Sequence, residues 1–433
     1  MNDMSRRIVP PLAAPPDEPE RPRHHRSGPF GVLDIGTTKI ACLIGRTESD
    51  GTLRVLGFGW HRGRGVRGGS IVDLEEAEKA VRACVGQAED MADTRLRSVT
   101  VNLSCGQPES RLFNVQWPVG GRAVADSDVR RVVNEGRARA VTEGRESIHA
   151  LPLTFAVDET EHVLDPRGLF CSTLGARLHV IDAASTALRS LGACMARCDL
   201  EIAELVSAPM ATGLSTLVED ERELGCTVID MGGGTTGMAV FAEGQLLHTA
   251  QLPIGGLHVT KDLASGLSTS ITHAERLKTL YGNVQACADD ERELLPVPLV
   301  GEEEHQIAKV PRSMVVNIIR PRMEETFELV KDRLDRSGLN RAAGNRVVLT
   351  GGACQLAGLR EMAGRMLGRQ VRLGKPHLVR GLPDSASGPA FATATGLLHW
   401  ASGEGRTMHD VDLEEERPAG LLRRLVNFLK DRV

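Results

Sequence analysis

Two distant stretches of the sequence carry the same pattern, and their spacing strongly limits the folds that the chain can adopt. One stretch reads FGVLDIGTTKIACLIGR and continues into LRVLGFGW; the other reads CTVIDMGGGTTGMAVFAEGQLLHTAQLPIGG. Each is typical of a β-rich strand, an Asp-x-Gly turn, a returning strand and a third strand. The two aspartates, Asp34 and Asp230, lie 196 positions apart (230 − 34). That distance is too long for a solenoid repeat and predicts two duplicated α/β lobes.

Composition narrows the class of protein. The chain has 433 residues, a net charge of −5 and only 3% aromatic residues. A negative chain with few aromatic side chains does not suit a dedicated nucleic-acid binder, which needs positive charge and stacking surfaces. The nine cysteines form no C-x-x-C pair, which is typical of reduced thiols in a cytosolic protein. No run approaches the ~18 apolar residues of a membrane-spanning helix, so none is predicted.

Both ends of the chain differ from its body. Residues 1–28 include PPLAAPPDEPERPRHHR, and this richness in proline and charge predicts a disordered tail. Residues 401–417 are polar and acidic and are interpreted as a linker. The linker leads to a short basic and apolar segment, 418–433, which ends the sequence.

This last segment has the residue spacing of an amphipathic helix. On a helical wheel its apolar side chains gather on one arc, with basic residues beside and opposite them. So short a helix does not span a bilayer but suits the surface of an anionic membrane. The alternative is a helix that docks back onto the body of the protein. The predicted membrane contacts are Leu421, Leu422, Arg423, Arg424, Leu425, Val426, Phe428, Leu429 and Lys430.

The two Asp-x-Gly turns have the chemistry of a phosphate site. Glycine turns expose successive backbone N–H groups, threonine hydroxyls add donors, and a lysine adds a point charge. Asp34 and Asp230 do not suit phosphate, but they suit Mg²⁺ held through its waters. One such turn alone favours a plain β-hairpin, whereas two in matching lobes favour phosphate binding. The predicted phosphate contacts are Gly36, Thr37, Thr38, Lys39, Gly232, Gly233, Gly234, Thr235 and Thr236.

A third glycine motif follows later in the chain. The stretch NRVVLTGGACQLAGLREMAGRML reads as a buried strand, the pair Gly351 and Gly352, and then a helix. Paired glycines let a ribose or a flat ring approach the backbone closely. The motif is weak alone, and its order after the other two turns makes it a predicted nucleotide contact.

Together these motifs resemble those of the actin, heat-shock-70 and sugar-kinase ATPase superfamily. LDIGTTK and VIDMGGGTTGMAV resemble its phosphate motifs, and VVLTGGACQLAGL resembles its adenosine motif. The chain is more similar still to the FtsA family of bacterial division proteins, through RGVRGGSIVDLEEAEKAV, SVTVNLS and LPIGGLHVTKDLA. This resemblance implies an α/β, actin-like two-lobe ATPase fold with duplicated ribonuclease-H-like lobes and an inserted subdomain in the first lobe.

The resemblance also implies a function. A chain of this family would bind ATP and Mg²⁺, self-associate, and anchor the FtsZ ring to the cytoplasmic face of the inner membrane at the division site. The implied partners are FtsZ, further copies of the chain, an anionic lipid surface and other division proteins, without nucleic acid. No residue stands out as the one that aligns an attacking water, so we expect at most slow ATP hydrolysis and assign no catalytic residue.

The same resemblance divides the chain into segments. The expected layout is the tail (1–28), the first lobe (29–106), the inserted subdomain (107–177), the first lobe again (178–204), the second lobe (205–263), its small subdomain (264–310), the second lobe again (311–373), a return to the first lobe (374–400), the linker (401–417) and the amphipathic helix (418–433). In the small subdomain, ITHAERLKTLYG matches the family's adenine-contact helix, with Glu275 and Lys278 as nucleotide contacts. A solvated Glu–Lys pair is an equally good interpretation.

Three further points stay open at this stage. GRGVRG, residues 63–68, has the formal pattern of a dinucleotide loop, but the next strand ends in Asn and Ser rather than an acid, so we favour a flexible loop. Pro321 is expected to kink or restart its helix. The alternative function is a soluble sugar- or acetate-type kinase of the same superfamily, which needs a carboxylate base and a polyol pocket but no amphipathic tail.

Overall fold

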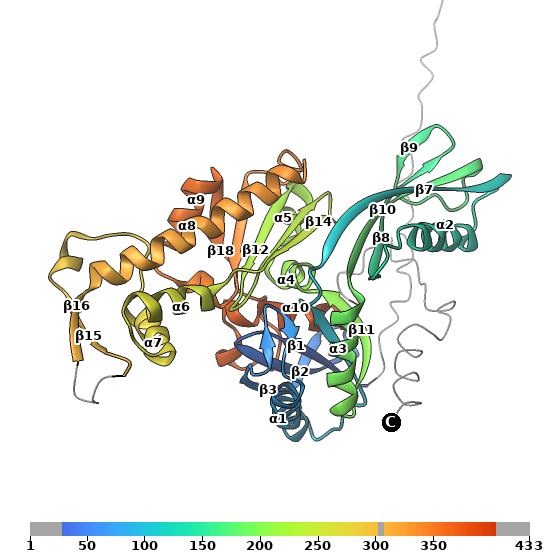
Figure 1. Cartoon of the computed structure of the whole chain (residues 1–433). Coiled ribbons are helices and arrows are strands. Elements are labelled where there is room, and N and C mark those ends of the chain that lie inside the picture. Colours follow the sequence, from blue (N-terminus) through green and yellow to red (C-terminus); the bar gives the residue numbers. More distant parts are fainter. Residues whose placement is uncertain (1–27, 302–306, 404–433) are drawn as a thin grey trace, which may run out of the picture.

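The computed structural model describes residues 28–301 and 307–403. Most of the predicted tail (1–28) and linker (401–417), and the whole predicted amphipathic helix (418–433), lie outside the described residues. Within those residues the chain forms two lobes, and a smaller subdomain projects from each of them (Figure 1). No helix in the described part is long and apolar enough to cross a bilayer.

The first lobe is built on a five-stranded sheet in the order β11-β6-β1-β2-β3. Strands β1, β2 and β3 pair antiparallel, whereas β6 and β11 run parallel to β1. Helix α1 packs on β2 and β3, and it begins where the Asp73 side chain accepts a hydrogen bond from the backbone N–H of Glu76. The elements are β1 (Phe30–Ile35), β2 (Lys39–Thr47), β3 (Leu53–Arg62), β4 (Val66–Arg67), β5 (Ser70–Ile71), α1 (Leu74–Ala92), β6 (Ser98–Leu103), α3 (Ser185–Arg197) and β11 (Glu201–Ser207).

The second lobe repeats this sheet, with the order β14-β13-β12-β17-β18. Strands β12, β13 and β14 are again antiparallel, and β17 and β18 again run parallel to β12. The identical order and directions confirm the duplicated two-lobe fold. The elements are α5 (Glu219–Leu224), β12 (Cys226–Met231), β13 (Thr236–Ala242), β14 (Gln245–Leu252), β17 (Arg346–Thr350), η2 (Gly352–Gln355), α9 (Leu359–Leu367), β18 (Gln370–Leu373), η3 (Asp384–Ala386) and η4 (Pro389–Phe391).

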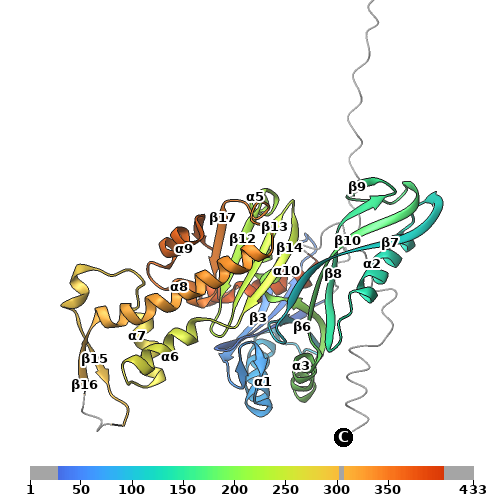
Figure 2. The same cartoon turned by 45° about the horizontal axis from the view of Figure 1, so that its top comes forward.

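The subdomain inserted in the first lobe has a sheet of its own, in the order β7-β10-β8-β9. Helix α2 packs on it, and together they enclose a separate apolar core. The subdomain also contacts the second lobe at β14: Gln245 Nε2 donates to the Leu153 carbonyl at 2.7 Å, and the Thr249 N–H donates to Ser110 Oγ at 3.1 Å. The insert therefore touches both lobes (Figure 2). Its elements are β7 (Glu109–Ala123), α2 (Asp126–Arg139), β8 (Arg145–Val157), β9 (Thr160–Val163) and β10 (Phe170–Ala184).

The small subdomain of the second lobe carries two helices and a β-ribbon at one end of the long helix α8 (Figure 1). Its apolar core is continuous with one face of the second sheet. Helix α8 runs without a break through Pro321, so the expected restart there is wrong. The elements are α6 (Gly256–Gly266), α7 (Ile271–Tyr281), η1 (Ala288–Glu291), β15 (Leu294–Pro298), β16 (Ile307–Pro311) and α8 (Arg312–Arg336).

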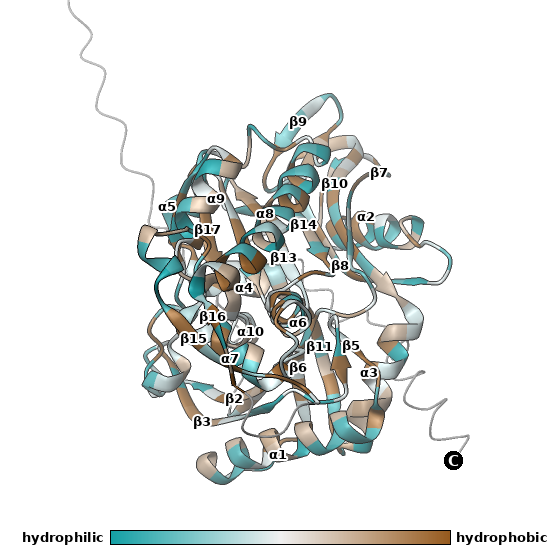
Figure 3. Ribbon diagram, turned by 60° about the vertical axis from the view of Figure 1, so that its left-hand side comes forward, coloured by the Kyte–Doolittle hydropathy of each residue, from teal (hydrophilic) through white to brown (hydrophobic). Residues whose placement is uncertain are grey.

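Two helices carry the chain between the lobes and pack on each other: α4 (Ala208–Thr216) and α10 (Ala392–Ala401). They approach so closely that a Cβ on Gly396 would lie 1.7 Å from the carbonyl oxygen of Ala211. The core around them joins the first sheet to the adjoining face of the second. In Figure 3 the hydrophobic colour is concentrated on the central strands, whereas the outer helices α1 and α2 mix hydrophilic and hydrophobic residues. The contact between the lobes is thus a packed helix pair.

Almost all of the cysteine side chains are buried. Eight of the nine are buried free thiols, and Cys287, which precedes η1, is exposed. Burial raises the pKa of the Cys84, Cys226 and Cys354 thiols to about 12, which suppresses the reactive thiolate form. Reactivity toward thiol reagents should therefore be concentrated at Cys287.

A buried histidine joins the insert to the end of β11 and to α10. His149, on β8, accepts a hydrogen bond at its Nε2 from the Ser207 N–H at 3.1 Å, and its ring lies 5.7 Å from that of Trp400 on α10. The Nε2 atom accepts only when the ring is neutral. Burial, assisted by the charge of Arg137, lowers the pKa of His149 to about 4.

This histidine predicts acid sensitivity of the fold. The unfolded chain binds a proton near pH 6.5 while the folded chain resists it down to about 4, so stability falls as the pH drops through that window. We expect His149→Gln, which keeps an acceptor but does not titrate, to remove about 2 kcal/mol of the loss between pH 7 and pH 5. Urea unfolding of both proteins at the two pH values measures this; equal losses in both proteins would contradict it.

Candidate nucleotide site

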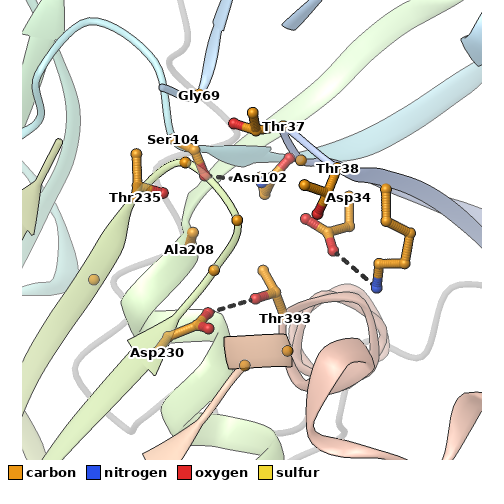
Figure 4. Close-up of a pocket in the computed structure, with 18 of the residues that line it drawn as sticks. Asp34, Thr37, Thr38, Gly69, Asn102, Ser104, Ala208, Asp230, Thr235 and Thr393 are labelled. Carbon is orange, nitrogen blue, oxygen red and sulfur yellow. Dashed lines mark hydrogen bonds and ion pairs between the residues drawn. The ribbon is translucent and has the colours of Figure 1, made fainter. Parts of the chain in front are cut away.

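A pocket lies between the lobes where the three glycine motifs meet (Figure 4). It holds about 740 Å³ of empty space, open solvent at its mouth included. Polar groups from both sheets line it, as expected where strands of α/β sheets end. The sequence-predicted residues that line the pocket are Asp34, Gly36, Thr37, Thr38, Lys39, Asp230, Gly232, Gly233, Gly234, Thr235, Gly351 and Gly352.

The two predicted phosphate loops, residues 36–39 and 232–235, have the same turn geometry. In the first loop the Gly36 N–H donates to the Lys39 carbonyl at 2.9 Å, and in the second the Gly232 N–H donates to the Thr235 carbonyl at 2.9 Å. Each turn follows the first strand of its sheet, β1 or β12. The repeated Asp-x-Gly pattern therefore produces two equivalent turns that face one pocket.

The loops also contact each other, and glycine makes that contact possible. A Cβ on Gly233 would lie 2.5 Å from Thr38 Cγ2, and one on Gly234 would lie 2.4 Å from Thr37 Oγ1. Both distances are far below a carbon–carbon or carbon–oxygen contact. Side chains at these positions would push the lobes apart, so these glycines set how closely the two loops approach.

One carboxylate from each lobe lies in the pocket. Burial raises the pKa of Asp34 to about 6, against the ammonium of Lys39 and with a smaller contribution from the charge of Asp230. Burial also raises the pKa of Asp230, against hydrogen bonds from Thr393 and Thr212. Two carboxylates whose charged form is disfavoured by their surroundings are groups that a hard divalent cation would stabilise. The residues present thus fit Mg²⁺.

Lys39 lies in the pocket wall with its ammonium group already engaged. It donates to the Ala390 carbonyl, lies 3.6 Å from the centre of the Phe391 ring, and is 3.8 Å from Asp34 Oδ2. Burial lowers its pKa, an effect that Asp34 opposes. The lysine therefore links the first phosphate loop to η4, and a phosphate contact would need its side chain to turn.

Three of the predicted nucleotide contacts, Thr236, Glu275 and Lys278, do not line the pocket. The hydroxyl of Thr236 is buried and donates to the Ile254 carbonyl at 2.8 Å, away from the loop. Lys278 Nζ donates to Glu275 Oε2 at 2.8 Å and to the Gly256 carbonyl at 3.1 Å. This pair lies beside the start of α6, whose Gly256 N–H donates to the carbonyl of Gly232. The structure thus brings Glu275 and Lys278 next to the second phosphate loop, as a pair that is already satisfied.

Other pocket residues escaped the sequence analysis. Asn102, at the end of β6, accepts from the Ile35 N–H at 2.7 Å and donates to Ser104 Oγ at 2.9 Å. Gln251, on β14, donates to the Ser104 carbonyl at 2.6 Å and so joins the lobes. The signal was present, because polar residues at the end of a parallel strand mark the ligand edge of a sheet. In the sequence, Asn102 and Ser104 served only to argue against a dinucleotide fold.

The GRGVRG segment is also part of the site. Its Val66 and Arg67 form β4, which pairs with β5 in a short hairpin whose turn is Gly68 and Gly69. The Gly63 N–H donates to the Thr38 carbonyl at 2.9 Å, and Gly69 lines the pocket. A Cβ on Gly69 would lie 2.0 Å from the Ser104 carbonyl oxygen. The segment thus packs against the first phosphate loop.

The fold and the paired loops define an actin-like two-lobe protein. Solved structures with the same fold include a chain of the PilM–PilN type IV pilus biogenesis complex (TM-score 0.62, 17% identity, 86% of this chain and 98% of that chain). Another is MreB5 of Spiroplasma citri bound to ADP (TM-score 0.52, 13% identity, 86% and 95%). These likenesses confirm the predicted fold class.

The family follows from sequence comparison. The model for cell division protein FtsA matches residues 227–396, and the model for the SHS2 domain inserted in FtsA matches residues 105–182. Cell division protein FtsA of Rhizobium meliloti (strain 1021) is 44% identical over 86% of this chain and 87% of that protein. Its counterpart in Escherichia coli (strain K12) is 33% identical over 92% and 96%. The chain belongs to the FtsA family of cell division proteins.

Proposed function

We propose that the chain binds ATP with Mg²⁺ between its lobes, self-associates, and anchors FtsZ to the cytoplasmic face of the inner membrane at the division site. The observation that carries this proposal is the pocket, where a phosphate loop and a carboxylate from each lobe face one another. Membership of the FtsA family supports the division role over a soluble kinase. Hydrolysis is not part of the proposal.

The residues of the pocket have distinct tasks in this proposal. Backbone N–H groups of the two glycine loops bind the phosphates, and Asp34 and Asp230 hold Mg²⁺ through its waters. The bound cation neutralises part of the triphosphate charge. Gly351 has a positive φ of 83°, and a Cβ there would lie 2.3 Å from Asp230 Oδ1. Only glycine therefore lets the third motif reach the nucleotide beside the aspartate.

The remaining partners act through other parts of the chain. FtsZ, further copies of the chain, other division proteins and an anionic lipid surface are the proposed partners. The amphipathic segment 418–433 is the proposed membrane contact, and it lies outside the described residues. One such helix binds a bilayer weakly and reversibly. Self-association multiplies these contacts at high local concentration, so assembly makes attachment firm.

A vesicle flotation experiment tests the membrane role. We expect the full chain to float with anionic liposomes and to carry added FtsZ with it, more strongly in ATP than without nucleotide. A chain that ends at Pro418 should leave both proteins at the bottom of the gradient, because the apolar arc is gone. Flotation separates membrane-bound protein from polymers that only sediment.

Two substitutions sharpen the test. Leu425→Gln removes an apolar side chain from the arc and should strongly reduce flotation, since each buried side chain of this size contributes about 2 kcal/mol. Asn427→Gln, on the polar side of the same helix, should leave flotation unchanged. Equal flotation of the full chain and the chain ending at Pro418 would sink the anchor proposal.

A further inference from the structure

A single turn receives a contact from each of the three glycine motifs. The turn comprises Pro389 to Thr393, that is, η4 and the first two residues of α10. The first motif reaches it through Lys39, whose ammonium donates to the Ala390 carbonyl. The third motif reaches it through the Gly351 N–H, which donates to the Pro389 carbonyl at 3.2 Å. Nothing in the sequence pattern set this segment apart.

The second motif is joined to the turn by two threonines. Thr393 Oγ1, on α10, donates to Asp230 Oδ2 at 2.9 Å (Figure 4). Thr212 Oγ1, on α4, lies 2.9 Å from the same oxygen and 2.9 Å from the Ala208 carbonyl oxygen, so its one proton can serve either acceptor. The two hydroxyls are 3.0 Å apart. Thr212 is fully buried, and Thr393 is 8% exposed. Both contacts end on Oδ2, which leaves Oδ1, beside Gly351, for water or a cation.

The two threonines come from the helices that cross between the lobes. Thr212 lies next to Ala211, whose carbonyl oxygen would be 1.7 Å from a Cβ on Gly396 of α10. The hydroxyls that contact the Asp230 carboxylate therefore lie on the two packed helices, close in sequence to the Ala211–Gly396 contact. A hydrogen bond to a charged carboxylate is stronger than one between neutral groups.

We propose that Thr212 and Thr393 are positioning residues of the nucleotide site, which aim Asp230 at the cation and tie occupancy of the site to the packing of α4 on α10. This inference rests on the proposed nucleotide function. It assigns a role to Thr393, which lines the pocket, and to Thr212 behind it, through their contact with Asp230. It also gives a reason for the threonine hydroxyls at Thr212 of α4 and Thr393 of α10.

The chain offers a closely matched set of variants. Thr393→Val keeps the shape of the side chain and removes its hydroxyl, and Thr393→Ser restores the hydroxyl. Thr395→Val is the control: it lies on the same helix, and its buried hydroxyl has no hydrogen-bond partner among the described residues. Titration calorimetry with AMPPNP, once with Mg²⁺ and once with EDTA, measures affinity for each full-length protein.

The positioning role predicts a loss that depends on the cation. Removing an outer-shell partner of a metal ligand typically costs about ten-fold to a hundred-fold in affinity. We expect Thr393→Val to weaken AMPPNP binding by about ten-fold in Mg²⁺ and to leave it unchanged in EDTA. Thr393→Ser and Thr395→Val should match the wild type under both conditions. Hydrogen exchange should show that Mg²⁺–AMPPNP protects α4 and α10 in the wild type but not in Thr393→Val.

Each other outcome has a definite meaning. Wild-type affinity of Thr393→Val in Mg²⁺, or an equal loss with and without Mg²⁺, overturns the positioning role and leaves the nucleotide function standing. A wild-type chain that does not bind AMPPNP in either buffer overturns the nucleotide function, and the positioning role falls with it.

Discussion

Replacing Asp230 with asparagine should lower the affinity for Mg²⁺–ATP by roughly a hundred-fold, because the substitution removes the second-lobe charge that faces the cation. The same change should leave the ligand-free chain as stable as the wild type or slightly more stable. Burial raises the pKa of Asp230, so holding the carboxylate ionised costs folding free energy at neutral pH. Asparagine keeps an oxygen that accepts from Thr212 and Thr393 without that cost.

Calorimetry with Mg²⁺–AMPPNP and thermal unfolding of the ligand-free protein measure the two effects. Their opposite directions distinguish a functional carboxylate from a structural one. Asp128 is the matched control, since it is fully buried in the insert and pairs with Arg122 Nη1 at 2.6 Å. Asp128→Asn should destabilise the chain and leave nucleotide affinity intact. Undiminished affinity in Asp230→Asn would remove Asp230 from the proposed site.

The second large effect concerns the packing of the lobes. Gly396→Ala should lower the free energy of unfolding by about 3 kcal/mol or more, because the new methyl group meets the Ala211 carbonyl oxygen. The obstacle is backbone in the middle of a helix, so no side-chain rotation relieves it. The two helices must separate, and the shared core around them loosens. Urea unfolding followed by circular dichroism measures the loss.

Gly192, in the interior of α3, provides the comparison. A Cβ there meets nothing within 4 Å, so Gly192→Ala should stabilise the chain by about 0.5–1 kcal/mol through helix propensity. The two substitutions make the same chemical change in two helices and differ only in their surroundings. Similar effects at both positions would contradict the close crossing of α4 and α10.

The lobes and their phosphate loops could be predicted because their information is local. Asp34 and Asp230 each end a β-rich run and open a glycine turn, and such patterns determine strand and turn together. Two copies of the pattern then imply two sheets of one topology. Gly351 and Gly352 could be placed for the same reason.

The rest of the site depends on contacts between distant segments. Thr393 meets Asp230 across 163 positions and Lys39 meets Ala390 across 351, and no local pattern in one sequence reports such pairs. The contacts of the turn at Pro389 to Thr393 therefore cannot be predicted from the sequence. The restart expected at Pro321 is wrong for a related reason. Apolar side chains on both sides of it are buried along one helix, and this tertiary packing offsets the hydrogen bond that proline loses.

The single exposed thiol gives the molecule a built-in place for a probe. Cys287 stands on the small subdomain of the second lobe, and the other eight cysteines are buried. A maleimide dye added to the unaltered chain should label that position first, without a cysteine-free background. Its fluorescence would then report movements of this subdomain during nucleotide binding and assembly on vesicles.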